Sequence, residues 1–221
     1  MGKRLLYAVK CGEMSMYVTR VQMHKRTQIQ KGISDTYGFH KFVYSMFKDV
    51  RSDEQKRTGH KSGIIWVDKG LRNLERTLLI VSDREPVVDG GQFEGVEVST
   101  RDLPNGYLGF ERYQFNLTVN PVIKEFGTGK YLPVIGEGEI KQWLVSKSEE
   151  HWGFKLVDDE FAVVRNFPDK FQTGHKIVIN KALITGRLEV VDQDKFAAAF
   201  QNGIGRAKTY GCGLLELTPE M

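Results

Sequence analysis

Cysteine is scarce in this chain, and metal-binding patterns are missing. Only 2 of its 221 residues are cysteines, Cys11 and Cys212, and they lie far apart. No CxxC or HExxH motif occurs, and the 5 histidines are scattered singly. Zinc sites need clustered Cys, His or carboxylate ligands, so we expect no metal ion and no cofactor. Two distant cysteines without an export signal are typical of free thiols in a reducing compartment.

A long hydrophobic run is missing as well. A membrane-spanning helix needs about 18 to 20 consecutive apolar residues, and no stretch approaches this length. The apolar segment 4–9 is too short for the core of a secretory signal, and no small-residue cleavage site follows it. We therefore expect a cytoplasmic protein that has no membrane partner.

Acidic residues are absent from one segment near the start of the chain. Residues 20–34 contain none, although the formal net charge of the whole chain is only +4. The basic residues of this segment are Arg20, Lys25, Arg26 and Lys31. A second basic run, 165–187, contains a single acidic residue, Asp169. Such runs attract polyanions, of which a phosphate backbone is the commonest, but ordinary solvated loop charge explains either run alone equally well.

Hydrophobic periodicity predicts strands and helices that divide into two similar halves. Alternation of apolar and polar residues predicts strands, and a 3.6-residue period predicts helices. The first half contains expected strands at 14–21, 63–67, 76–81 and 96–98, and a helix that begins at an N-cap formed by Ser34 or Asp35 and runs to residue 47. The second half contains an expected strand at 113–119, a helix at 137–152, paired strands at 177–179 and 182–190, a helix at 193–201 and a strand at 214–217.

This order of elements indicates an α+β protein with two tandem ferredoxin-like (RRM-like) domains. We place the first domain at 14–104 and the second at 110–221. Polar, glycine or proline residues predict loops at 51–62, at 121–133 and over most of 85–105. The last of these loops leaves no clear second helix in the first domain.

The helix after Ser34 carries the first group of residues suited to chemistry. At about 100° per residue, its core stripe contains Phe39, Val43, Met46, Phe47 and Val50. Its opposite side carries Tyr37, Lys41, Tyr44 and Lys48, with His40 at the edge. An imidazole with a pKa of about 6.5 can accept or donate a proton near neutrality. A solvated polar helix face is the alternative explanation of the same pattern.

A glycine-rich segment between the last helix and the last strand is the second group. It contains Gly203, Gly205, Gly211 and Gly213, with Arg206 and Lys208 between them. The segment follows a helix, so it is not a Rossmann motif, and its spacing is not that of a Walker loop. Its glycines suit a loop whose backbone N–H groups approach phosphates closely. A glycine-rich turn before an edge strand would have the same composition.

These motifs resemble a known family of CRISPR-associated, repeat-processing ribonucleases. The pattern Gly203-Ile204-Gly205-x-Ala207-Lys208-x-x-Gly211-Cys212-Gly213-Leu214-Leu215 is similar to the glycine loop of the CasE branch, a subunit of the type I-E Cascade complex. The pattern Asp35-x-Tyr37-x-x-His40 resembles the catalytic helix of that branch. A middle segment with Asn120-Pro121, Lys124 and Gly129-Lys130 also matches. Together the motifs occur in the order of the family and extend from residue 16 to residue 217.

The resemblance implies an endoribonuclease that cleaves CRISPR precursor RNA at the repeat hairpin without metal. The ribose 2′-OH would attack the adjacent phosphate and leave a 2′,3′-cyclic phosphate and a 5′-OH. His40 would act as general acid or base, Tyr37 would orient the reacting groups, and Lys41 would stabilise the phosphate. The protein, as a subunit of Cascade, would retain the processed CRISPR RNA, so the expected partners are the repeat hairpin and other Cascade subunits.

A wider set of residues is expected to bind the RNA through its phosphates and 2′-hydroxyls. The set is Arg26, Lys124, Lys130, Gly203, Gly205, Arg206, Lys208, Gly211 and Gly213. Two alternatives remain open from the sequence. A non-catalytic, RRM-like subunit would bind CRISPR RNA and never cut it, whereas a ferredoxin-like regulatory domain would show no salt-sensitive RNA binding.

Overall fold

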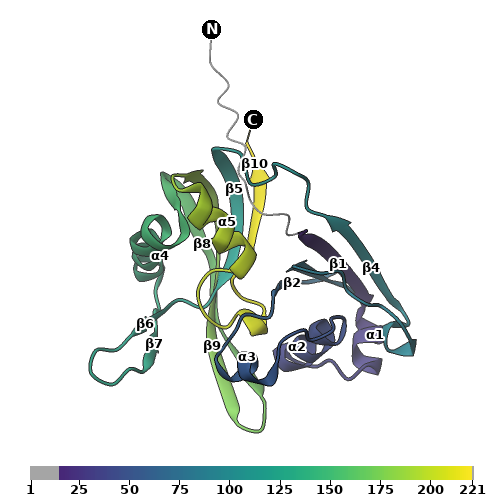
Figure 1. The fold of residues 1–221 in the computed structure, drawn as a ribbon. Coiled ribbons are helices and arrows are strands. Elements are labelled where there is room, and N and C mark those ends of the chain that lie inside the picture. The colour runs from purple at the N-terminus through teal and green to yellow at the C-terminus, as the bar shows by residue number, and fades with distance from the viewer. Residues whose placement is uncertain (1–14, 221) are drawn as a thin grey trace.

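The computed structural model describes residues 15–220, apart from the side chains of 158–160. Two antiparallel four-stranded sheets and their helices form the molecule, and a separate two-stranded hairpin projects from it (Figure 1). The start of the expected first strand, at Met14, lies outside the described residues. None of the helices in 15–220 is both long and apolar enough to span a membrane.

The first sheet is built from the N-terminal half of the chain. Its elements in chain order are β1 (Tyr17–His24), α1 (Lys25–Gln30), α2 (Thr36–Ser45), α3 (Asp53–Arg57), β2 (Ile64–Arg72), β3 (Glu75–Ser82), the 3₁₀ turn η1 (Gly91–Phe93) and β4 (Val96–Asp102). The strand order is β2-β3-β1-β4, and every neighbouring pair is antiparallel. This is the ferredoxin-like order, in which η1 takes the place of the second helix.

The second sheet repeats this order. Its elements are β5 (Arg112–Val119), β6 (Val122–Lys124), β7 (Tyr131–Pro133), α4 (Glu137–Trp152), β8 (Phe154–Gln172), β9 (Lys176–Val190), α5 (Gln193–Asn202), the 3₁₀ turn η2 (Lys208–Tyr210) and β10 (Leu215–Pro219). Its strand order is β10-β5-β9-β8, and β6 pairs with β7 in the projecting hairpin. The predicted α+β fold with tandem ferredoxin-like units is confirmed, whereas the domain boundaries at 104 and 110 stay predictions.

One predicted hairpin is wrong. The expected strands 177–179 and 182–190 are a single continuous strand, β9, which pairs along its length with β8, a strand the sequence did not predict. The turn lies instead at Gly174, where φ is +87°. Asn180 and Lys181 remain in the strand because tertiary contacts satisfy them: the Asn180 amide donates to the Val134 carbonyl, and Lys181 pairs with Asp169.

Two predicted loops contain regular structure. The segment 51–62 includes the short helix α3, which Ser52 begins with a capping box to Gln55. The segment 121–133 includes the hairpin β6–β7. Helix α1 was also not predicted, and Val50 is 64% exposed because α2 ends at Ser45, before the expected core stripe is complete.

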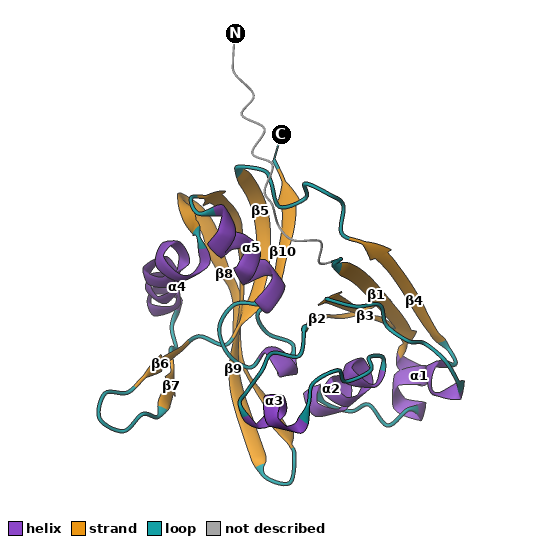
Figure 2. Cartoon of the chain, viewed as in Figure 1, coloured by secondary structure: helices purple, strands orange, loops and turns teal. Residues whose placement is uncertain are grey.

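The first four residues of strand β2 are buried on both faces and join the two halves of the molecule. Its residues Ile64 and Trp66 pack with α2 in one hydrophobic cluster. Ile65 and Val67 point to the other side and share a cluster with α4, α5 and β5 of the second sheet. Figure 2 shows the resulting arrangement, with the loop after α5 lying between β2 and α2 on one side and β9 on the other. The glycine-rich segment therefore reaches the catalytic helix predicted from the sequence.

Candidate active site

Helix α2 holds His40 in a fixed orientation at its edge. The Asp35 side chain caps the helix by accepting a hydrogen bond of 2.8 Å from the backbone N–H of Gly38. Phe39 and Val43 are buried in the first core, which sets the rotation of the helix about its axis. His40 follows Phe39 by one position and is consequently half-buried.

The His40 ring is held by a backbone carbonyl from the glycine loop. Its Nδ1 atom lies 2.9 Å from the carbonyl oxygen of Thr209. A carbonyl only accepts hydrogen bonds, so Nδ1 carries the proton and Nε2 is the free nitrogen of the neutral ring. Burial lowers the pKa of His40 below 6.5, and the hydrogen bond to Thr209 partly opposes this shift. Both effects together favour the neutral ring at pH 7, with Nε2 as its hydrogen-bond acceptor.

Aromatic rings surround His40. The ring centroids of Tyr37, Tyr44 and Tyr210 lie 5.9, 4.5 and 5.5 Å from its centroid. The Lys41 Nζ lies 4.9 Å from the Tyr37 ring centroid, as a cation–π pair. The structure therefore brings Tyr37, His40 and Lys41 together, and it adds Tyr44 and Tyr210. The catalytic roles of the first three stay predictions.

Trp66 also forms a hydrogen bond to the Thr209 carbonyl. Its indole Nε1 donates to the Thr209 oxygen at 3.2 Å, so this oxygen accepts from both Trp66 and His40. A Cβ at Gly211 would lie 3.1 Å from the Trp66 ring. The glycine lets the loop lie flat on the indole and brings Thr209 to His40. Sequence reasoning missed Trp66 because its contact with Thr209 spans 143 positions.

The glycines of the loop shape its path. Gly203, Gly211 and Gly213 are buried, Gly205 is half-buried, and all of them have positive φ. A Cβ at Gly213 would lie 2.5 Å from the Ile204 carbonyl oxygen. The Gly213 N–H already donates to the Thr118 carbonyl at 2.7 Å. Loop geometry accounts for the glycines, and their expected contact with RNA stays a prediction.

Two lysines, Lys61 and Lys208, lie near each other beside helix α2. Lys208 is half-buried in η2, and burial lowers its pKa, with a further decrease from the charge of Lys61. Neither lysine forms an ion pair within the part of the chain that the structure describes. Adjacent ammonium groups without a carboxylate favour an anion between them. Lys61 lies in the predicted loop 51–62, where no motif marked it.

A buried ion pair fixes the β8–β9 hairpin against the site. The Lys181 Nζ lies 2.9 Å from Asp169 Oδ2 and donates to the Tyr210 carbonyl at 2.7 Å. The same carboxylate accepts a 2.7 Å hydrogen bond from Thr36 Oγ1, at the first residue of α2. Residues of β8, β9, α2 and η2 are thereby linked, although no sequence pattern indicated this network.

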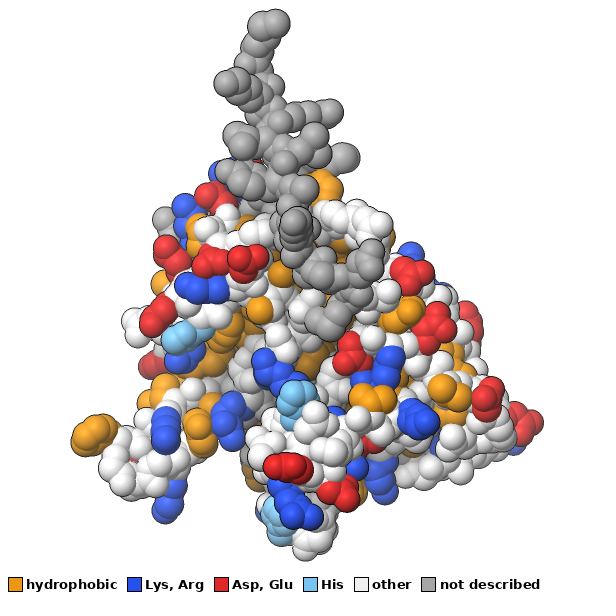
Figure 3. Space-filling view, viewed as in Figure 1, with side chains coloured by type: hydrophobic (Ala, Val, Ile, Leu, Met, Phe, Trp, Pro, Cys, Tyr) orange, Lys and Arg blue, Asp and Glu red, His pale blue; other side chains and the backbone are white. Residues whose placement is uncertain are grey.

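The other expected RNA-binding residues fall into separate places. Lys124 and Lys130 are exposed on the β6–β7 hairpin, and the Arg206 guanidinium lies 3.9 Å from the ring centroid of Tyr131 on the same hairpin. Figure 3 shows Lys or Arg side chains and exposed hydrophobic ones together on this projection. Arg26 lies in α1, on the opposite side of the molecule (Figure 1). The structure brings Lys124, Lys130 and Arg206 to one region and leaves Arg26 apart.

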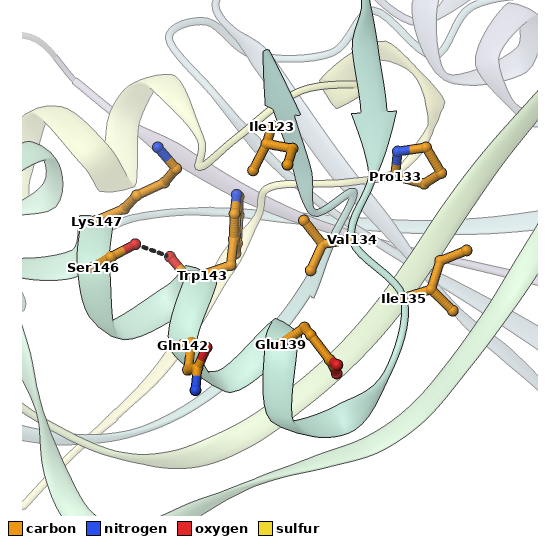
Figure 4. Close-up of a pocket in the computed structure, with 9 residues that line it drawn as sticks. All are labelled: Ile123, Pro133, Val134, Ile135, Glu139, Gln142, Trp143, Ser146 and Lys147. Atoms are coloured by element: carbon orange, nitrogen blue, oxygen red, sulfur yellow. Dashed lines mark hydrogen bonds between the residues drawn. The ribbon is translucent and has the colours of Figure 1, made fainter. Parts of the chain in front are cut away.

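An open groove of about 670 Å³ lies between the β6–β7 hairpin and α4 (Figure 4). Its lining is mostly apolar and includes Ile123, Val134 and Trp143, with Glu139 and Lys147 at its rim. The groove contains no histidine, so it lacks the acid–base group of the α2 site. In residues 15–220 no group of three or more His, Cys, Asp or Glu side chains is arranged to hold a metal ion.

Comparison with known proteins was made by sequence and by structure. Residues 16–219 match the family described as CRISPR associated protein. The CRISPR-associated endoribonuclease Cse3 of Thermus thermophilus is 32% identical over an alignment of 220 residues. The match covers 92% of this chain and 100% of that protein. The structure of Thermus thermophilus Cse3 bound to an RNA representing a pre-cleavage complex matches with a TM-score of 0.74 at 22% identity, over 93% of this chain and 100% of that one.

The CRISPR-associated protein Cas6e of Escherichia coli K-12 matches as well. Its TM-score is 0.67 at 21% identity, and the match covers 92% of this chain and 100% of Cas6e. These structural matches show the same fold. The family match over 16–219 and the identity to Cse3 over nearly the whole chain show the relationship. This chain therefore belongs to the family of CRISPR-associated proteins that includes the endoribonuclease Cse3.

Proposed function

We propose that this protein is a metal-independent endoribonuclease that cleaves CRISPR precursor RNA at the repeat hairpin. Membership in the family of the endoribonuclease Cse3 supports this activity. The structural observation that carries it is the hydrogen bond between His40 Nδ1 and the Thr209 carbonyl. This bond leaves Nε2 free to take a proton from a substrate hydroxyl.

The reaction follows from the groups around His40. Nε2 accepts the proton of a ribose 2′-OH, and the 2′-oxygen forms a bond to the adjacent phosphorus. The P–O5′ bond breaks and the 5′-oxygen takes up a proton from water, which leaves a 2′,3′-cyclic phosphate and a 5′-OH. Lys41 stabilises the negative charge that develops on the phosphorane, and Tyr37 orients the reacting nucleotide. Lys208, which precedes Thr209 in the chain, and Lys61 near it add positive charge beside the loop that holds His40.

The RNA remains bound after cleavage, and the protein acts as a subunit of a Cascade complex in the cytoplasm. A solved CRISPR RNA-guided surveillance complex contains a chain with this fold, at a TM-score of 0.63 and 19% identity. The cationic side chains Lys124, Lys130 and Arg206 supply the salt-sensitive part of the affinity through phosphate contacts.

The alternative is a subunit that binds CRISPR RNA without cutting it. It rests on the RRM-like fold of both halves, since such sheets also serve non-catalytic RNA binding. Incubation of the protein with hairpin repeat RNA in excess EDTA separates the two. We expect cleavage at one phosphate, with a 2′,3′-cyclic phosphate on the upstream product. Intact RNA that stays bound would favour the alternative.

The His40→Ala variant tests the assignment of the site. We expect it to lose cleavage and to keep its affinity for the hairpin, because the imidazole carries the proton and the lysines hold the phosphates. His151→Ala is the matched control, since His151 is exposed at the end of α4, away from Thr209. Cleavage by His40→Ala at the wild-type rate would contradict the assignment.

A further inference from the structure

Tyr131 and Arg206 form a cation–π pair on the surface between the projecting hairpin and the glycine loop. The Arg206 Cζ lies 3.9 Å from the Tyr131 ring centroid, and Arg206 also forms an isolated β-bridge with Asn120. Tyr131 stays 47% exposed and Arg206 is exposed, so the pair presents a planar surface to solvent. The sequence marked Arg206 as a phosphate ligand and did not mark Tyr131.

The surroundings of the pair are cationic and aromatic. Lys124 is the cross-strand neighbour of Tyr131, and Lys130 precedes it in the chain. Neither lysine has an ion-pair partner among the residues described, and the nearby carboxylate of Glu125 bonds to the Thr128 hydroxyl instead. Cations that follow a backbone, together with planar groups on which bases stack, are the mark of a site for single-stranded nucleic acid.

This surface lies close to the reacting group along the chain. Arg206 precedes Thr209, which holds His40, by only three positions. Their Cα atoms are therefore at most about 10 to 11 Å apart, because a residue spans no more than about 3.6 Å. An RNA strand whose phosphate lies at His40 reaches the pair within a few nucleotides.

The proposed cleavage requires a nucleotide that leaves the helical stack. Attack by the 2′-oxygen needs this oxygen, the phosphorus and the leaving 5′-oxygen close to one line, and a regular A-form helix holds the 2′-oxygen off that line. The nucleotide must rotate out, which costs its stacking energy. Stacking on an aromatic ring or on the plane of a guanidinium offsets that cost.

We infer that the base of a nucleotide directly flanking the cleaved phosphate is unpaired and stacks on the Tyr131–Arg206 pair. This inference rests on the proposed function, since it names a subsite for that substrate. The stem of the hairpin contributes phosphates to Lys124 and Lys130, whereas the flanking base contributes its planar face to the pair. The pair thus helps to select a substrate with an unpaired or weakly paired nucleotide at the cut.

A cycle of protein and RNA changes tests the inference. The RNA carries a 2′-deoxy nucleotide before the cleaved phosphate, so it binds without reacting, and an abasic sugar replaces each flanking nucleotide in turn. We expect loss of one of the two bases to weaken binding to the wild-type protein by about 5- to 150-fold, the range typical of one stacked base. The same RNA change is expected to have no further effect in Tyr131→Leu, which keeps an apolar side chain and removes the ring.

Three further variants define the outcome. Tyr131→Phe keeps the ring and is expected to behave as wild type, whereas Arg206→Lys keeps the charge, loses the plane and is expected to behave as Tyr131→Leu. Phe110→Leu is the control, because Phe110 is an exposed aromatic residue near Arg112, at the far end of β5 from Asn120.

The inference is overturned if, at both flanking nucleotides, base removal weakens binding to Tyr131→Leu by the same factor as binding to the wild-type protein. It is also overturned if Tyr131→Leu binds all the RNAs as wild type does. Cleavage of the reactive RNA by the wild-type protein in EDTA is measured in parallel. Normal cleavage without any coupling refutes the stacking site alone, whereas absent cleavage refutes the proposed function and leaves the coupling as a separate result.

Discussion

The Nδ1 atom of His40 lies 2.9 Å from the carbonyl oxygen of Thr209, although 169 positions separate the two residues. His40 belongs to the helix of the first sheet, and Thr209 belongs to the loop before the last strand of the second. The bond fixes the tautomer of the imidazole and places its free nitrogen. The imidazole and the residue that orients it thus come from different halves of the molecule, so the candidate site depends on their packing.

The rate of cleavage is expected to fall in acid with a midpoint below pH 6.5. Burial lowers the pKa of His40 from 6.5, and only the neutral imidazole can accept the 2′-OH proton. The rate therefore rises with pH through this lowered pKa and then levels off. Single-turnover cleavage between about pH 5 and pH 8 measures the profile. A midpoint above 6.5 would contradict the lowered pKa, and a rate that declines as His40 deprotonates would show that it acts as an acid.

Trp66→Phe is expected to slow cleavage while RNA affinity is kept. The change removes the indole donor to the Thr209 carbonyl, which lies 3.2 Å from Nε1. Loss of one such bond costs about 1 kcal/mol, which corresponds to about 5-fold in rate if His40 loses its orientation. The midpoint of the pH profile should shift as well, which a general loss of stability would not produce.

Trp143→Phe is the control for Trp66→Phe. The Trp143 indole donates to the Val122 carbonyl at 3.0 Å, at the base of the β6–β7 hairpin, so the chemical change is the same. We expect its pH midpoint to equal that of the wild-type protein. Equal midpoints in both variants would mean that Trp66 does not act through His40.

Gly213→Ala is expected to destabilise the fold far more than Gly174→Ala. Both glycines have nearly the same φ, +88° and +87°, so the backbone cost of about 1 to 2 kcal/mol is shared. A Cβ at Gly213 would lie 2.5 Å from the Ile204 carbonyl oxygen, whereas one at Gly174 would meet nothing within 4 Å. We expect a total loss of about 3 kcal/mol or more at Gly213. Urea unfolding of both variants measures the difference, and equal losses would contradict it.

Lys181→Met is expected to cost about 3 kcal/mol of stability. It leaves the largely buried Asp169 carboxylate without its cation, and the Tyr210 carbonyl loses its donor. The double variant with Asp169→Asn should lose less than the sum of the single changes, because no unpaired charge remains. Lys155→Met is the control: its pair with Glu189 is exposed, so we expect a change within about 0.5 kcal/mol. Additive losses in the double variant would contradict the coupling.

Lys124→Ala and Lys130→Ala are each expected to reduce the salt dependence of RNA binding. A lysine that neutralises one phosphate contributes about 1 to the slope of log affinity against log salt. Titrations with hairpin RNA at several salt concentrations measure this slope. Lys195→Ala, which changes an α5 lysine paired with Asp192, should leave the slope unchanged. An unchanged slope in both hairpin variants would remove these lysines from the RNA interface.

Local signals predicted much of the fold. The helix 137–152 matches α4, and the Asp35 cap and apolar stripe placed α2, because both signals lie within a few neighbouring residues. The sequence did not predict β8 or the continuity of β9. Asn180 and Lys181 are polar and suggested a turn, and their partners Val134 and Asp169 come from other elements. A strand that is stabilised by contacts with distant residues need not show a periodic pattern in its own sequence.

The sequence by itself determined the family, the repeated ferredoxin-like plan and the group Tyr37, His40 and Lys41. Residues three or four positions apart share a helix face, so one short segment is enough to place them together. Tertiary structure alone decided which nitrogen of His40 is free and why the loop needs glycine at Gly211. The first depends on Thr209 and the second on Trp66, two residues that are 143 positions apart and meet only because the sheets pack against each other. Hydrogen bonds and steric contacts act over a few ångströms in space, and distance along the chain does not record them.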